Sequence, residues 1–300
     1  MAAKLGLWFL PFLLFFLMNG VNIGCRDLKA ELQGHTEMNS HHGNLNRPNY
    51  LIGYKTNAHG SDKDFSSSST NVDHTEAFKV GYFAMDDLFV GNIMTLQFPV
   101  EEVPHFLSKK EADSIPFSTS QLPTVLQLFS ISQDSPQAKF MRDTLELCEA
   151  GMLTQETRIC ANSLDSMLEF VNNILGSEEK HNIYTTSPPS GAPLQNYTIL
   201  KVSEDIYAPK WVACHPLPYP YAVYYCHFIA TNTRIFKVLL VGENGDKVEA
   251  LGVCHLDTSE FNPNHVIFKQ LGFMPGEAPL CHFFPLKNLM WVPQPTATTM

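Results

Sequence analysis

Apolar residues recur three and four positions apart in the middle of the chain, which is the period of a helix that buries one face. This pattern covers residues 122–129, 135–150 and 158–175. Ser108 and Glu111 have the spacing of a capping box, which indicates that a further helix begins there. We therefore expect a group of helices between about residues 108 and 175.

From about residue 182 the pattern changes to short segments rich in β-branched and aromatic residues, which predict strands. These segments are residues 197–202, 211–216, 221–230, 234–241 and 248–255, and residues 94–98 alternate in the same way. Asn244-Gly245 is a hairpin signal between the last two, and a helix is expected over 262–271. Helices followed by strands predict an α+β domain whose N-terminal helices pack on a C-terminal antiparallel β-sheet, stapled by disulfides.

The N-terminal quarter of the chain differs from this domain. Lys4 precedes an uncharged apolar run, residues 5–18, which is typical of a secretory signal peptide; we assign it to residues 1–24. The run is shorter than the roughly 18 apolar residues of a membrane span, and Pro11 interrupts it. Residues 25–77 are rich in Gly, Asn, Ser and His and predict a variable, largely disordered leader, so the domain occupies residues 78–300.

Composition and charge narrow the classes of partner. The 44% of hydrophobic residues can form a sizeable core, and 20 basic against 30 acidic residues give a net charge of -10, which argues against nucleic-acid binding. No second membrane span follows, so no membrane association is expected after signal cleavage. In an oxidising compartment the cysteines should pair unless a metal binds them, with Cys25 left over from the seven, and Asn196, in the sequon Asn196-Tyr197-Thr198, is a candidate glycosylation site.

Cys148 and Cys160 lie next to the connection between two of the predicted helices. A disulfide there would clip the two helices together, and closing so short a loop is worth about 3 kcal/mol in the chain-entropy model. The alternative is a pair of buried free thiols.

Four further cysteines are each followed directly by a histidine: Cys214-His215, Cys226-His227, Cys254-His255 and Cys281-His282. Successive side chains on a strand point to opposite faces, so the cysteines should form two disulfides on one side while the imidazoles converge on the other. The imidazoles would then bind a transition metal such as copper, zinc, nickel or iron. Two alternatives stay open: a zinc site that uses cysteine and histidine, although adjacent ligands fit zinc badly, and a wholly structural role.

The spacing of these dipeptides resembles the C-terminal signature of the plant BURP-domain family. Ten, 26 and 25 residues separate successive Cys-His pairs, and Trp291-Val292-Pro293 follows the last pair. The resemblance extends over residues 80–295 and to the family layout of signal peptide, variable segment and C-terminal domain. Because the variable segment has no repeats, the chain is similar to the short, repeat-free members. The resemblance implies a secreted plant protein of the extracellular space, cell wall, or endomembrane and vacuolar compartments.

The resemblance also implies two possible functions. Some BURP-domain proteins are copper-dependent oxidative peptide cyclases that modify a core peptide in their own chain. On that basis the copper ligands are His215, His227, His255 and His282, and the adjacent cysteines hold the ligand strands in place. The substrate would be the chain's own leader, in which one candidate core peptide contains Tyr50, Leu51, Ile52 and Tyr54.

The second possibility is a non-catalytic cell-wall or apoplastic protein with a role in development, seed or stress response. Its partner would be a cell-wall polysaccharide or a wall enzyme. No acid or base stands out in the sequence as a catalytic group, so the sequence alone leaves both possibilities open.

Overall fold

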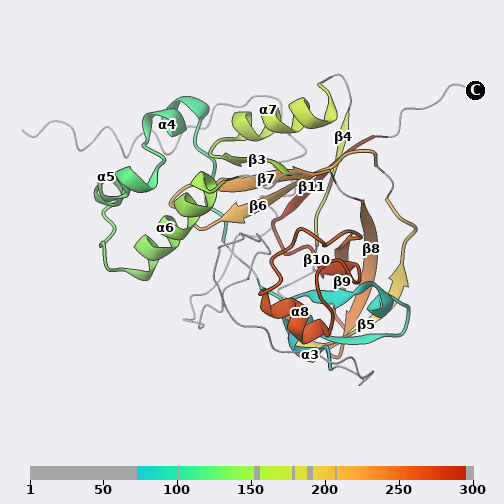
Figure 1. Ribbon diagram of the computed structural model, residues 1–300. Helices are drawn as coiled ribbons and strands as arrows, with labels where there is room; N and C mark the ends of the chain where they lie inside the picture. The colour runs from blue at the N-terminus through green and yellow to red at the C-terminus, as the bar shows by residue number, and fades with distance from the viewer. Residues whose placement is uncertain are drawn as a thin grey trace, which may run out of the picture. The chain divides into compact units, whose positions relative to one another are not determined.

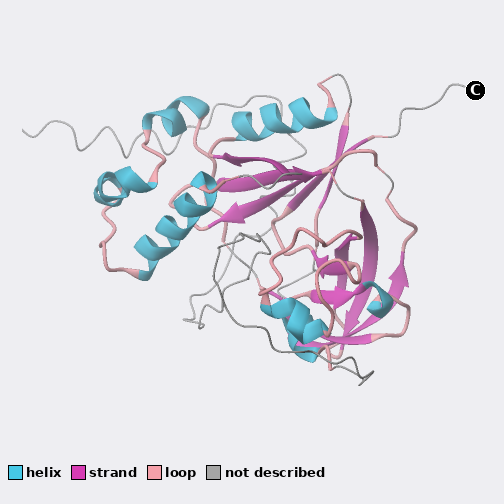
Figure 2. Ribbon diagram, viewed as in Figure 1, coloured by secondary structure: helices cyan, strands magenta, loops and turns pink. Residues whose placement is uncertain are grey.

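A computed structural model describes residues 73–99, 102–151, 156–177, 180–187, 192–206, 208–230 and 232–294, all of which belong to one compact unit. The predicted signal peptide, most of the predicted leader, and the core-peptide residues Tyr50, Leu51, Ile52 and Tyr54 lie outside the described residues. Within them, helices and antiparallel strands occur together, and three disulfides are present, as expected for a disulfide-stapled α+β domain (Figures 1 and 2). No helix of this described part is long and apolar enough to cross a membrane.

The strands form two antiparallel sheets, where one C-terminal sheet was predicted. The larger sheet has the order β1-β10-β9-β8-β5-β2 and the smaller one the order β3-β7-β6-β11-β4. The larger sheet consists of β1 (Tyr82–Ala84), β2 (Ile93–Phe98), β5 (Ala192–Val202), β8 (Thr233–Gly242), β9 (Lys247–His255) and β10 (Leu280–Phe283). The smaller sheet consists of β3 (Glu156–Ala161), β4 (His181–Tyr184), β6 (Val212–Leu217), β7 (Val223–Ile229) and β11 (Leu289–Pro293).

The helices are short and several begin at a capping side chain. They are α3 (Thr75–Lys79), α4 (Lys109–Ser114), α5 (Leu122–Leu128), α6 (Pro136–Glu149), α7 (Leu164–Leu175) and α8 (Val266–Leu271), with the 3-10 turns η2 (Met85–Asp87) and η3 (Thr119–Gln121). Ser108, Ser135 and Ser163 accept a backbone N–H of the first turn of α4, α6 and α7, which satisfies a donor that the helix itself leaves free. The capping box predicted at Ser108 is confirmed.

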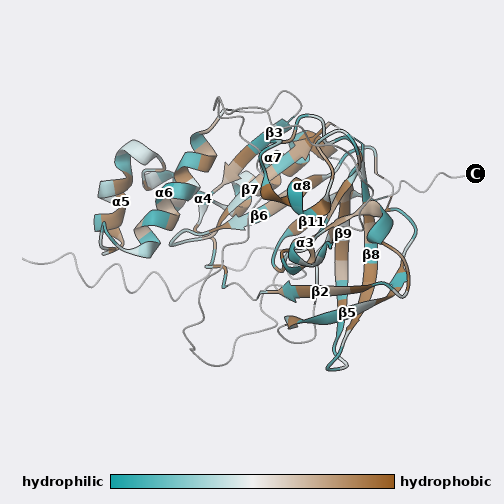
Figure 3. Ribbon diagram, turned by 60° about the horizontal axis from the view of Figure 1, so that its bottom comes forward, coloured by the Kyte–Doolittle hydropathy of each residue, from teal (hydrophilic) through white to brown (hydrophobic). Residues whose placement is uncertain are grey.

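Buried apolar side chains tie these elements together. One cluster contains Ala213 and Met290 of the smaller sheet with Leu251 and Val253 of the larger sheet, so the two sheets share a core. Another joins α5 and α6 to β6 and β7 of the smaller sheet. Figure 3 shows the corresponding pattern, with hydrophobic colour concentrated along strands such as β8 and β9 and the helices α5 and α6 striped. The sheet junction is therefore largely buried, and the candidate site lies there.

The helix predicted over residues 158–175 is wrong at its beginning. Residues Glu156–Ala161 form β3 and pair in antiparallel register with β7, and α7 starts only after the cap at Ser163. Pairing with a neighbouring strand outweighs the helical spacing of the apolar residues there. The Cys148–Cys160 disulfide therefore joins the end of α6 to a strand, not to a second helix.

Candidate functional site

The Cys-His dipeptides lie on two pairs of adjacent strands, one pair in each sheet. Cys214 is directly opposite Cys226 across β6 and β7, and Cys254 is directly opposite Cys281 across β9 and β10. Both opposed pairs are disulfides, with Cα atoms 4.0 Å apart. The register of the strands thus settles a connectivity that the sequence left open.

Neighbouring residues on a strand point to opposite faces, so the two histidines beside each disulfide lie together on the face opposite to it. They are diagonal neighbours on the same two strands. In the smaller sheet, His215 Nε2 lies 3.1 Å from His227 Nε2. In the larger sheet, the rings of His255 and His282 stack with centroids 5.5 Å apart and planes inclined by 22°. The same local arrangement therefore occurs twice, once in each sheet.

Two aromatic side chains join the two histidine pairs into one cluster. The Trp211 ring lies 6.1 Å from that of His227 and 6.5 Å from that of His255. Phe284 contacts the other two imidazoles, with ring centroids 5.2 and 6.2 Å away. The structure thus brings all four histidines of the dipeptides together at the junction of the sheets, and we call this group the histidine cluster.

The histidine pair of the smaller sheet has its Nδ1 atoms turned toward acceptors. Asn288 Nδ2 donates to the carbonyl of Leu286 (2.9 Å), so Asn288 Oδ1 is the atom that faces His215 Nδ1 at 2.6 Å. His227 Nδ1 lies 3.1 Å from Glu156 Oε1, close in distance but not aligned as a regular hydrogen bond. Because both neighbours are oxygens that accept, His215 Nδ1 and His227 Nδ1 carry hydrogen, and the two Nε2 atoms face each other at hydrogen-bond distance.

The pair in the larger sheet is held more loosely. His255 Nδ1 lies 3.5 Å from the hydroxyl of Thr233, and His282 Nδ1 lies 3.4 Å from the carbonyl of Phe283. Both distances are at the outer limit of a hydrogen bond. These two imidazoles therefore lack the shorter contacts with acceptors that orient His215 and His227, and they are packed mainly against aromatic rings.

Burial keeps three of the four imidazoles neutral. Burial, followed by the electrostatic effect of neighbouring histidines, lowers the pKa of His215, His255 and His282 to about 3 in each case. At neutral pH each is therefore an unprotonated base, which is the form of histidine that binds metal ions.

The donor chemistry of the cluster fits a transition-metal ion, and the arrangement gathers part of a ligand set. His215 Nε2 and His227 Nε2 are 3.1 Å apart, a distance that a hydrogen bond between the rings or a cation bound by both nitrogens accommodates. Cys214, Cys226, Cys254 and Cys281 are all in disulfides, so no thiolate competes. Over the described ranges, however, no group of three or more His, Cys, Asp or Glu side chains is arranged closely enough to hold one ion. A full four-histidine ligand set would require the stacked rings of His255 and His282 to turn.

Glu156 is the main site residue that the sequence analysis missed. Its side chain is 5% exposed, and its Oε1 accepts the hydroxyl of Tyr225 at 2.6 Å beside His227. Burial acts to raise the pKa of this carboxyl, but the contacts with His227 and Tyr225 and the charge of Arg158 together lower it below its usual range. A sequence signal existed, since Glu156 and Arg158 are two apart and share one face of a strand, but it required residues 156–161 to be recognised as a strand.

Asn196, the candidate glycosylation residue, lies half-buried on β5. Its side-chain oxygen accepts the hydroxyl of Thr95 at 2.7 Å, and its Nδ2 donates to Glu243 at 2.9 Å. The nitrogen that would carry a glycan is therefore engaged in the folded protein, so attachment would have to precede folding or break the contact with Glu243.

The chain is similar to several known plant proteins. The sequence model of the BURP domain family matches residues 81–293 of this chain. BURP domain-containing protein BNM2A of Brassica napus is 40% identical over 221 residues, which cover 70% of this chain and 78% of that protein. BURP domain protein USPL1 of Arabidopsis thaliana is 38% identical over 221 residues, 70% of this chain and 79% of that protein. Protein RAFTIN 1B of Triticum aestivum is 38% identical over 213 residues, 70% of this chain and 59% of that protein.

Proposed function

The chain belongs to the BURP-domain family, and from that premise we propose that it is a secreted protein whose histidine cluster binds a copper ion. The observation that supports the proposal is the 3.1 Å approach of His215 Nε2 to His227 Nε2, which places two imidazole nitrogens where one ion can bind both. Three disulfides support secretion, because such bonds persist in the oxidising compartments outside the cytosol.

Copper is favoured among the metals that imidazole binds. With the neighbouring cysteines in disulfides, the ligands are neutral nitrogens alone, and such sites bind Cu(II) more tightly than the other divalent ions of the first transition row. This argument disfavours the zinc site with thiolate ligands that the sequence left open. When bound, copper supplies one-electron redox chemistry in a buried site.

Two functions are compatible with such a site. As an enzyme, the protein would be a copper-dependent peptide cyclase that acts on its own leader, at Tyr50, Leu51, Ile52 and Tyr54. As a non-enzymatic protein, it would be a metal-binding protein of the cell wall or apoplast, with a role in development, seed or stress response and a wall polysaccharide or wall enzyme as partner.

Copper titration of the purified secreted protein, freed of metal by a chelator, tests metal binding. We expect one ion per chain and a thermal unfolding midpoint that rises with copper, since a ligand at 100 times its Kd stabilises by about 2.7 kcal/mol. His227→Ala should bind copper much more weakly and remain folded, whereas His105→Ala, at an exposed histidine, should bind like the wild type. Cys226→Ser should impair secretion because it breaks a disulfide within the site.

Two results would contradict copper binding by the histidine cluster. Failure of the wild type to bind copper would overturn the proposal, and equal misfolding of His227→Ala and Cys226→Ser would make the histidines structural.

Mass spectrometry of the copper-loaded protein then separates the enzymatic from the non-enzymatic function. A cyclase that uses dioxygen as its oxidant removes two hydrogen atoms per crosslink from the peptide that contains Tyr50 and Tyr54 and reduces the dioxygen to hydrogen peroxide. An unchanged peptide mass with copper bound in air leaves the non-enzymatic function.

A further inference from the structure

We propose that Glu156 is a positioning residue for the histidine cluster: it holds His227 with Nδ1 protonated and Nε2 turned toward His215. The inference rests on the proposed function in one respect, that the ligand of the cluster is a metal ion. Glu156 is the first residue of β3, and its Cα partner on β7 is Ile229, two residues from His227. The carboxylate therefore reaches the cluster from the neighbouring strand.

The contacts of Glu156 allow one direction of hydrogen bonding. Its Oε1 accepts the Tyr225 hydroxyl at 2.6 Å and lies 3.1 Å from His227 Nδ1. An ionised carboxylate accepts and cannot donate, so the hydrogen between it and the imidazole belongs to Nδ1. His227 Nδ1 is buried and makes no regular hydrogen bond, so a small rotation that aligns it with Glu156 Oε1 would satisfy this donor. Contacts of this kind often tighten only when the ligand is bound.

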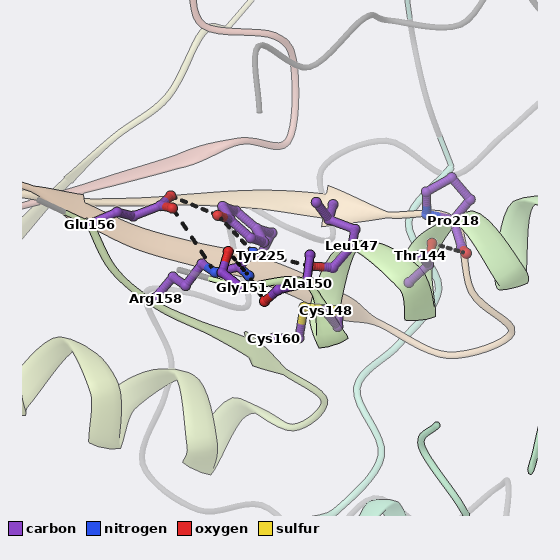
Figure 4. The surroundings of a disulfide bond; sticks show 10 residues. All are labelled: Thr144, Leu147, Cys148, Ala150, Gly151, Glu156, Arg158, Cys160, Pro218 and Tyr225. Carbon is purple, nitrogen blue, oxygen red and sulfur yellow. Dashed lines mark hydrogen bonds and ion pairs between the residues drawn. A yellow bond between two sulfur atoms is a disulfide. The ribbon is translucent and has the colours of Figure 1, made fainter. Parts of the chain in front are cut away.

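Arg158 fixes the carboxylate from the other side. Its side chain is 5% exposed, its Nη1 donates to the Tyr225 hydroxyl at 3.2 Å, and its Nε lies 4.0 Å from Glu156 Oε2 (Figure 4). The guanidinium also lies over the Tyr225 ring, 5.4 Å from its centroid. Glu156, Arg158 and Tyr225 thus form one buried network in which the acidic group has a charged neighbour and a hydrogen-bond donor.

The end of helix α6 holds Arg158 in turn. Nη1 donates to the carbonyl of Leu147 at 3.1 Å, and Nη2 donates to the carbonyls of Ala150 and Gly151, the latter at 3.1 Å. Carbonyls at the C-terminal end of a helix lack partners within the helix and carry partial negative charge, which suits a guanidinium. The Cys148–Cys160 disulfide ties this helix end to β3 beside the network (Figure 4).

A carboxylate behind a metal-binding imidazole fixes the ring and its tautomer and makes the nitrogen a stronger donor to the metal. It also places a negative charge near a bound cation. Removing such a partner typically lowers metal affinity by about 10- to 100-fold.

The test compares two charge-neutralising variants of the full secreted protein. Glu156→Gln keeps the size of the buried side chain and removes its charge, and Glu146→Gln makes the same change on an exposed position of α6. We expect Glu156→Gln to lower copper affinity by about 10- to 100-fold and to change the electron paramagnetic resonance spectrum of bound Cu(II). Glu146→Gln should match the wild type in both. Wild-type affinity and spectrum in Glu156→Gln would overturn the inference and leave the proposed function intact.

A measurement on the metal-free protein separates failure of the inference from failure of the proposed function. Nitrogen-15 chemical shifts of the His227 ring should show the Nδ1-protonated tautomer in the wild type and in Glu146→Gln, and its loss in Glu156→Gln. If the wild type binds no copper, the proposed function fails, and this tautomer comparison alone decides the role of Glu156. An unchanged tautomer in Glu156→Gln would overturn that role.

Tyr225→Phe provides a second variant in case Glu156→Gln does not fold. It removes the 2.6 Å hydrogen bond to Glu156 and keeps the buried ring. Affinity for copper should fall severalfold, in the same direction as in Glu156→Gln but by less. Unchanged affinity in a folded Tyr225→Phe protein would count against the network as a positioning device.

Discussion

At the scale of single residues, the buried imidazoles make the metal-free fold sensitive to mild acid. His215, His255 and His282 have a pKa of about 3 in the folded protein, whereas an unfolded histidine titrates near 6.5. Between these values the unfolded chain binds more protons than the folded one, so the free energy of unfolding falls as the pH falls. Each fully titrating histidine contributes up to about 1.4 kcal/mol per pH unit.

Urea denaturation between pH 7.5 and 5, with chelator present, measures this dependence. This pH window lies above the range in which titration of Glu156 changes the free energy of unfolding. A carboxyl whose pKa is lowered in the folded protein stabilises it at any pH above the unfolded pKa, and this stabilisation is lost only at lower pH. His255→Asn should reduce the slope of the free energy of unfolding against pH by the contribution of one histidine. A flat profile in the wild type would show that the imidazoles are not held neutral by the fold.

Residue-scale prediction from sequence succeeded where the cause is local. Alternation along a strand is a property of two neighbouring residues, so the opposite faces of cysteine and histidine in Cys214-His215 followed from the dipeptide itself. Glu156 and Asn288 could not be found in this way. Each reaches the cluster from another strand or loop, 71 and 73 positions along the chain from the histidine that it contacts (227 − 156 and 288 − 215).

At the scale of elements, capping side chains decide where the short helices begin. Ser135 accepts the N–H of Ala138 at 3.1 Å at the start of α6, the helix whose far end holds Arg158. Ser135→Ala should lower the free energy of unfolding by about 1 kcal/mol. Ser132→Ala, at an exposed position before the helix, is the matched control and should change it by less than about 0.5 kcal/mol. Equal urea midpoints for the two variants would contradict the capping role.

The error over residues 158–175 shows the limit at this scale. The apolar spacing of α7 continues backward into Ile159 and Cys160, so the period alone gives no boundary. Ser163, which caps α7, was the local mark of the true start. Residues 156–161 form a strand because they pair with β7, more than sixty residues later in the chain. A local sequence pattern contains no information about such a distant partner.

At the scale of the whole molecule, Trp211 is one of the two aromatic side chains that link the two sheets. It is 4% exposed, belongs to the cluster shared by the sheets, and contacts His227 of one and His255 of the other. Trp211→Ala should lower the free energy of unfolding by about 3 to 5 kcal/mol. Phe89→Ala, at a ring that is 55% exposed, should change it by less than about 0.5 kcal/mol. Calorimetric midpoints of the two variants check the difference, and a small effect at Trp211 would mean that the sheets hold together by other contacts.

The α+β class could be predicted because helical and strand periods occupy different parts of the chain. The division into two sheets could not. It depends on β1, β2 and β3 joining strands far away in the sequence, and on Trp211 and its neighbours packing between the sheets, which are matters of long-range pairing. The histidine cluster shares this origin, because each sheet supplies half of it.

Each disulfide of the described residues closes a short stretch of chain, with separations of 12, 12 and 27 residues, and none runs from one sheet to the other. Under mechanical tension the residues inside these loops cannot extend while the bonds are intact. The sheets can, however, be drawn apart without breaking a disulfide, so only non-covalent packing and the connecting backbone resist a force that separates the two halves of the histidine cluster.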